Sequence, residues 1–114
     1  MASVRCDYVT EITPAKESWD VVVQVIRLWF VSNMNSKQKY YVMEMVLMGE
    51  KGDNIQASVK KNLLSRFDNK IREGIVYNFK YFGVAANTGV YRTIKHQFKL
   101  NLQNPTVVTE VGAD

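Results

Sequence analysis

The chain has 114 residues and a formal net charge of +4, with 46% hydrophobic and 23% charged residues. This length fits one domain, because two halves of it would each be too small to bury a core. The composition is typical of a folded globular domain and excludes a largely disordered chain. A single cysteine, Cys6, excludes an intrachain disulfide and a metal site built from several cysteines.

The sequence predicts neither a membrane span nor a secretory signal. No stretch approaches the ~20 consecutive apolar residues that cross a bilayer, and the first residues lack the apolar core of a secretory signal. With only one cysteine, the chain is expected in a reducing compartment, the cytosol or the nucleus, and without a membrane partner.

Basic residues are concentrated in one part of the chain. Between Gln56 and Lys99, nine basic residues stand against two acidic ones, which gives +7, while six basic and nine acidic residues elsewhere give −3. Such a region indicates a polyanionic partner, because each neutralised phosphate releases condensed counterions. A basic surface that only keeps the protein in solution explains the same charges equally well.

The first half of the chain predicts strands. Residues 1–17 are polar and predict a loosely attached lead-in, and the β-branched run Trp19–Val31 predicts a long first strand. Residues 33–38 predict a polar loop before a second strand, Lys39–Met48. A turn with two glycines then leads into a third strand, Ile55–Val59, so that strands two and three form a hairpin.

The apolar spacing then changes to that of a helix. Its apolar stripe consists of Leu63, Leu64, Phe67 and Ile71. Asn62 is expected as the N-cap and Gly74 as the stop signal. A fourth strand is predicted over Ile75–Val84 and a fifth over Tyr91–Leu102, with a hairpin loop at 85–89 between them.

The predicted order is strand, strand, strand, helix, strand, strand. It is the order of the OB-fold, a five-stranded, partly open Greek-key barrel with one helix between strands three and four. We therefore predict an all-β domain with one helix over residues 18–109, followed by a tail at 110–114. Trp19, Phe67 and Phe98 are expected in its core.

The second half of the chain carries motifs that resemble a known family. They are Phe82-Gly83-Val84-Ala85, Asn87-Thr88-Gly89 and Tyr91-Arg92-Thr93, followed by His96 and Lys99-Leu100-Asn101. The stretch from Trp19 to Val108 resembles the OB-fold domains of the replication protein A large subunit, and more closely the replication-protein-A-like family expanded in plants. The resemblance implies binding of single-stranded DNA in the nucleus, beside other replication or repair proteins, with the cytoplasm as the alternative location.

Family members hold the nucleic acid in a groove across strands two and three, where two aromatic side chains stack on bases. The resemblance places Tyr41 at one stacking position and Lys60 where replication protein A modules have the second aromatic. Because stacking contributes ~1–3 kcal/mol per base, this departure predicts weaker binding with a stronger dependence on salt.

Basic side chains on both rims of this groove are the candidate phosphate contacts. They are Arg27, Lys37, Lys39, Lys60, Lys61, Arg92 and Lys95. Trp29, near the end of the first strand, is interpreted as a lid on the barrel end or as a stacking platform. His96 has no cysteine or carboxylate at ligand spacing, so it is expected as a hydrogen-bonded barrel residue rather than a metal ligand.

The sequence shows no nucleophile with its base, no paired acid and base and no metal cluster. It therefore predicts a binding protein rather than an enzyme, with no cofactor, metal or small-molecule substrate. The main alternative is a protein-interaction module that captures acidic peptides in the same groove. DNA and RNA both stay open as ligands, because stacking and phosphate contacts are largely indifferent to the 2′-hydroxyl.

Overall fold

The computed structural model describes residues 7–16, 18–32, 41–87 and 94–112, and within them seven strands form one sheet. The strands are β1 (Asp20–Ser32), β2 (Tyr41–Gly49), β3 (Asn54–Val59), β4 (Val76–Lys80), β5 (Gly83–Ala86), β6 (Phe98–Asn101) and β7 (Val107–Glu110). The 3-10 helix η1 (Val9–Glu11) precedes β1, and the α-helix α1 (Lys61–Phe67) lies between β3 and β4.

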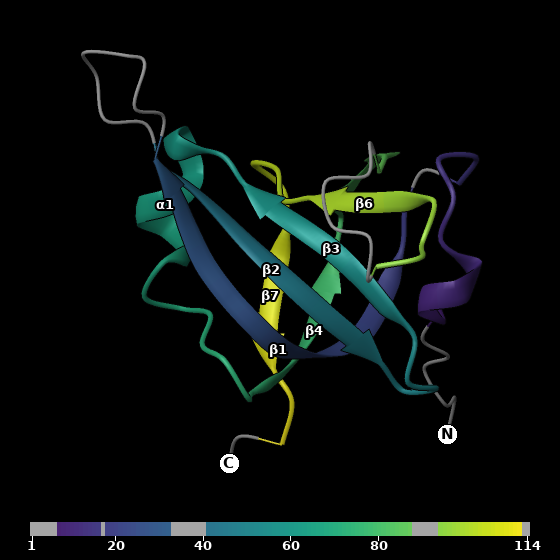
Figure 1. Cartoon of the computed structure of the whole chain (residues 1–114). Coiled ribbons are helices and arrows are strands. Elements are labelled where there is room, and N and C mark those ends of the chain that lie inside the picture. The colour runs from purple at the N-terminus through teal and green to yellow at the C-terminus, as the bar shows by residue number, and fades with distance from the viewer. Residues whose placement is uncertain (1–6, 17, 33–40, 88–93, 113–114) are drawn as a thin grey trace.

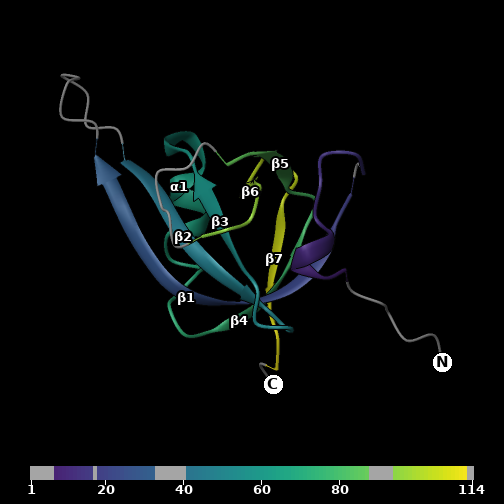
Figure 2. The same cartoon turned by 45° about the vertical axis from the view of Figure 1, so that its right-hand side comes forward.

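The sheet curls into a partly open barrel, in which the consecutive strands β4 and β5 pair with different neighbours. Neighbouring strands follow the order β5-β6-β3-β2-β1-β4-β7, so β4 and β5 lie far apart in the sheet although they are consecutive in the chain. Between them Tyr81 has a φ of 61°, which turns the chain away from β1 and toward β6. Figures 1 and 2 show the resulting curvature. The predicted fold class, an OB-fold with its helix after the third strand, is confirmed.

Two predicted strands need correction. The predicted fourth strand, Ile75–Val84, is two strands, β4 and β5, because the positive φ of Tyr81 interrupts it. Of the predicted fifth strand, Tyr91–Leu102, only Phe98–Asn101 is a strand among the described residues, as β6. The strand begins only at Phe98, because the Phe98 N–H donates to Nδ1 of His96 at 3.0 Å and not to a neighbouring strand.

A β-bulge at Ile26 decides which side chains of β1 face outward. Val25 pairs with Leu47 and Arg27 with Val46, so Ile26 has no partner in β2. Before the bulge the odd-numbered residues of β1 face the core, and after it the even-numbered ones share a face with the buried residues of β2. Since one extra residue exchanges the two faces of a strand, Arg27 and Trp29 lie on the outer face.

The core lies inside the barrel and is closed at both ends. α1 inserts Phe67, with 1% of its surface exposed, at the end of the barrel where β3 finishes. At the start of β3, residues 7–12 contribute Val9 and Ile12, which are 3% and 1% exposed. The prediction of a loosely attached lead-in is therefore wrong for these residues. β7 was not predicted either, and it extends the sheet beyond β4 as far as Glu110.

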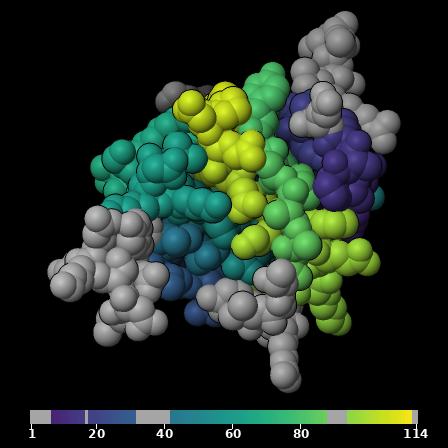
Figure 3. All heavy atoms as spheres, turned by 90° about the horizontal axis from the view of Figure 1, so that it is seen from above, coloured from purple at the N-terminus to yellow at the C-terminus, as the bar shows by residue number. Residues whose placement is uncertain are grey.

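The helix is shorter than its apolar stripe suggested. It begins at Lys61 with Lys60 as N-cap, so the prediction of Asn62 as N-cap is wrong. It ends at Phe67 rather than near Ile71, because Tyr77 Oη accepts a hydrogen bond from the Arg72 N–H at 2.8 Å and donates one to Lys70 O at 3.1 Å. Figure 3 shows the yellow C-terminal segment between α1 and the green β4–β5 segment. Arg66 of α1 donates to Thr106 O at 2.8 Å and joins the helix to this segment.

Gly49 is expected to be required for the closure of the barrel by η1. A Cβ at this position would lie 2.6 Å from Val9 Cγ2. We expect Gly49→Ala to lower the free energy of unfolding by about 1–3 kcal/mol, as overpacking does, measured by urea denaturation. Val9→Ala, which removes the contacting methyl groups, should be destabilising alone but should remove most of the added cost of Gly49→Ala. Additive losses in the double variant would contradict this packing.

Candidate nucleic-acid interface

Four neighbouring strands share one side of the sheet that is turned away from the core, here called the outer face. Cross-strand pairing places Trp29 of β1 beside Glu44 of β2, Glu44 beside Ser58 of β3, and Ser58 beside Asn101 of β6. The adjacent row, by the same pairings, consists of Arg27, Val46, Gln56 and Lys99. The outer face therefore combines one aromatic ring with polar and basic side chains.

A hydrogen-bonded network fixes the centre of the outer face. Oε1 of Glu44 accepts hydrogen bonds from Gln56 Nε2 at 3.0 Å and from Ser58 Oγ at 2.5 Å. Gln56 and Ser58 are only 6% and 5% exposed. Because buried polar groups need partners, these bonds hold the carboxylate in one position.

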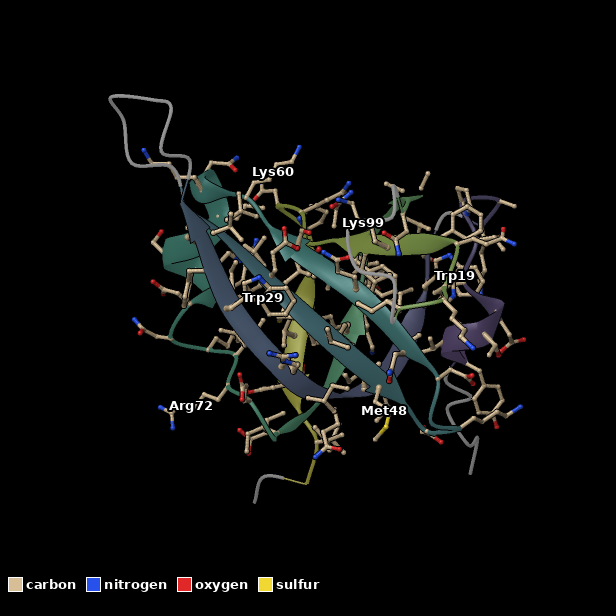
Figure 4. The ribbon with its side chains drawn as sticks, viewed as in Figure 1. Trp19, Trp29, Met48, Lys60, Arg72 and Lys99 are labelled. Carbon is tan, nitrogen blue, oxygen red and sulfur yellow. The ribbon has the colours of Figure 1, made fainter. Side chains whose placement is uncertain are left out.

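Lysines border this network. Lys60 directly follows β3 and is exposed, and Lys61 begins α1. Together with Val42 and Asn62 they line a pocket of about 590 Å³. Lys99 lies on β6, beside Gln56. In Figure 4 the Trp29 ring lies in front of the β1–β2 pair, with Lys60 and Lys99 toward the top of the view.

The structure brings some of the predicted site residues together and separates others. Arg27 and Trp29 share the outer face, with Lys60 and Lys61 at its border. Trp29 is half-buried on the strand surface. Lys95 lies at the other end of β3, where it lines a pocket of about 500 Å³ with residues that include His96 and Asp53.

The remaining predicted contacts lie wholly or partly outside the described residues. Tyr41 pairs with Ser32 through its backbone, but its side chain is outside the described part of the chain. Lys37, Lys39 and Arg92 lie entirely outside it.

Sequence reasoning missed several residues of the outer face. Glu44, Gln56 and Ser58 did not stand out because each is an ordinary polar residue in a strand. The alternation of Gln56 and Ser58 with the apolar side chains of β3 was the one available signal. Lys99 belongs to the basic region of the sequence, and only the pairing of β6 with β3 places it on the outer face.

His96 is hydrogen-bonded through both ring nitrogens, as expected. Its Nδ1 accepts from the Phe98 N–H, so Nε2 carries the proton and donates to Val9 O at 2.8 Å. The ring thereby attaches η1 to the segment before β6. Phe98 lies beside it with ring centroids 6.1 Å apart and is half-buried, so the prediction that Phe98 lies in the core is wrong.

The described part of the chain holds neither a cluster of metal ligands nor a helix that could span a membrane. No three His, Cys, Asp or Glu side chains gather there as metal ligands would. None of its helices has the length and apolar character needed to span a membrane.

Comparison with known proteins agrees with this architecture. Residues 10–113 match a family described as Domain of unknown function DUF223. The chain belongs to this family. No curated protein matches it significantly.

Solved structures similar to this DUF223 domain include the OB domain of Ta0387 from Thermoplasma acidophilum, with a TM-score of 0.66 at 9% identity and 93% of this chain and 86% of that chain covered. DNA binding domain A of Saccharomyces cerevisiae replication protein A has a TM-score of 0.73 at 16% identity, with 96% of each chain covered. A chain of a replication protein A heterotrimer bound to single-stranded DNA has a TM-score of 0.77 at 16% identity, and the domain covers 24% of that chain. Fission yeast Pot1 with single-stranded DNA has a TM-score of 0.62 at 13% identity, with 96% of this chain and 40% of that chain covered. The predicted resemblance to replication protein A is thus confirmed in the fold.

Proposed function

We propose that this DUF223 domain is a binding protein without catalytic activity, and that it holds single-stranded nucleic acid, DNA in the first instance, on its outer face. The observation that carries the proposal is the position of Trp29, which the bulge at Ile26 turns outward onto a surface bordered by Lys60, Lys61 and Lys99. A flexible single strand needs such a combination, an aromatic surface for its bases and cations along its phosphates. Similar solved structures are described as complexes with single-stranded DNA.

The ligand is held mainly by one stacking contact and several phosphate contacts. A base stacks on the ring of Trp29, while the backbone follows the lysines at the border. Lys60 and Lys61, with Val42, offer aliphatic stems and cationic heads where a second aromatic is usual in replication protein A modules. A larger share of the binding free energy is then electrostatic, so binding weakens steeply as salt rises.

The direct test is fluorescence anisotropy with a labelled single strand of about 20 nucleotides, longer than the ~4–16 nucleotides one OB-fold covers. Saturable binding that exceeds binding to a duplex of equal length is expected. Lys60→Ala and Lys99→Ala should each weaken binding and reduce the slope of log K against log salt by about 0.7, the value for one phosphate of a single strand.

The control is Lys70→Ala, which removes an exposed lysine beyond the end of α1. It should leave the salt slope near that of the unmodified domain. Failure of the single strand to bind even at low salt would overturn the proposal.

Capture of an acidic peptide is the second candidate, favoured by the lysine-lined pocket beside Val42. The fixed carboxylate of Glu44 at the centre of the same face argues against it, since an acidic side chain would be repelled there. An acidic peptide that displaces the labelled strand at equal concentration would favour this alternative.

A further inference from the structure

We propose that Glu44 reads the base stacked on Trp29 and selects bases with an exocyclic amino group over thymine and uracil. The inference rests on the proposed function, because it assigns a base preference to the same surface.

Glu44 lies directly beside the residue that would stack on the base. Trp29 and Glu44 are directly paired across β1 and β2, on the same side of the sheet. Cβ atoms of such pairs lie about 4.5–5.5 Å apart. A base that stacks on the indole therefore brings one of its edges next to the Glu44 carboxylate.

Among the described residues, donors reach only one carboxylate oxygen of Glu44. Gln56 and Ser58 both donate to Oε1, and Oε2 has no hydrogen-bond donor among the described residues. Because the two donors are themselves nearly buried, the carboxylate is held before any ligand arrives. A carboxylate accepts hydrogen bonds and donates none, so Oε2 can accept a hydrogen bond from a donor on the ligand.

The bases differ in the groups that their edges carry. Cytosine carries an amino group at C4, where uracil and thymine carry a carbonyl oxygen. The amino group at C4 donates to Oε2, whereas a carbonyl oxygen at C4 sets two acceptors against each other. A hydrogen bond to a charged group is worth enough to favour cytosine by about tenfold.

A carboxylate also weakens contact with the phosphate backbone, since like charges repel. On the same face as Lys60, Lys99 and Arg27, the Glu44 carboxylate lowers the affinity of the outer face for any polyanion that cannot donate a hydrogen bond to it. Selection by Glu44 thus combines attraction of amino groups with repulsion of ligands that lack them.

The test compares oligo-dC with oligo-dU of equal length, at mildly alkaline pH, by anisotropy. Cytosine and uracil have rings of similar size, so a difference in affinity between the two strands reports on the groups at the base edge. The unmodified domain should bind oligo-dC about tenfold more tightly. Glu44→Gln keeps an oxygen for Gln56 and Ser58 and puts an NH₂ group where Oε2 was, so the preference should disappear or turn toward oligo-dU.

The matched control is Glu50→Gln, the same change at an exposed residue in the turn after β2. It should leave the ratio of the two affinities unchanged. If Glu44→Gln fails to unfold cooperatively on heating, Glu44→Asp replaces it, since the shorter side chain keeps the charge but withdraws the carboxylate, and the oligo-dC preference should fall.

The outcomes separate the inference from the proposed function. Equal affinity of the unmodified domain for the two strands would overturn the inference and leave strand binding intact. A preference for oligo-dC that survives Glu44→Gln or Glu44→Asp would also overturn it. Absence of binding to either strand at low salt would overturn the proposed function itself.

Discussion

Replacing Trp29 with alanine is expected to weaken single-strand binding by about 5- to 150-fold, the range that corresponds to the ~1–3 kcal/mol of one base stack. The effect should be this large because Trp29 is the one aromatic ring in the two rows of side chains that define the outer face. Trp29→Phe should recover part of the affinity, since a smaller ring still stacks. The measurement is the anisotropy titration at constant salt.

The matched control for this variant is Tyr81→Ala. Tyr81 is 53% exposed and lies at the junction of β4 and β5, outside those two rows. Its loss should leave strand binding within a factor of about two, as surface changes outside an interface usually do. If Trp29→Ala binds as tightly as the unmodified domain, the stacking surface lies elsewhere, and Tyr41→Ala, expected to weaken binding severalfold, becomes the decisive variant.

Phe67→Ala is expected to lower the free energy of unfolding by about 3–5 kcal/mol. Phe67 is the buried residue of α1 and is 1% exposed, so its removal leaves a cavity at the end of the barrel. Domains of this type have a total stability of about 5–15 kcal/mol, so a substantial fraction of the variant would be unfolded at elevated temperature. Urea denaturation should show a lower midpoint with little change in slope.

Phe67→Leu is the control, because it retains most of the buried apolar volume. It should cost clearly less than the alanine variant. A loss below about 1 kcal/mol for Phe67→Ala would contradict the role of α1 as the cover of this end of the barrel.

The elements of the fold were largely predictable because they depend on local patterns. β1 and β3 were found within a residue of their ends, since β-branched residues and the glycine-containing turn mark them. Errors arose where distant groups intervene. Tyr77 of β4 hydrogen-bonds the backbone that follows α1, where the helix was expected to continue. The His96 side chain accepts the hydrogen bond of the Phe98 N–H, at the residue where β6 begins.

The candidate site was only partly predictable. Lys60 and Lys61 stand out because a basic pair follows a strand, but Lys95 belongs to another pocket at the far end of β3. Glu44 could not be identified as a site residue from the sequence, because the role of a glutamate in a strand depends on its cross-strand neighbours.

The sequence by itself determined the order of strands and helix, the basic region and the resemblance to replication protein A, because periodicity, turn residues and charge are local properties of the chain. Tertiary structure alone decided which side chains share a face. The bulge at Ile26 turns Trp29 outward, and the bend at Tyr81 leads the chain from β4, which pairs with β1, to β5, which pairs with β6. The pairing of β1, β2 and β3 brings Glu44 between Trp29 and Ser58. A shift of one residue exchanges the faces of a strand, and only the packed sheet fixes that register.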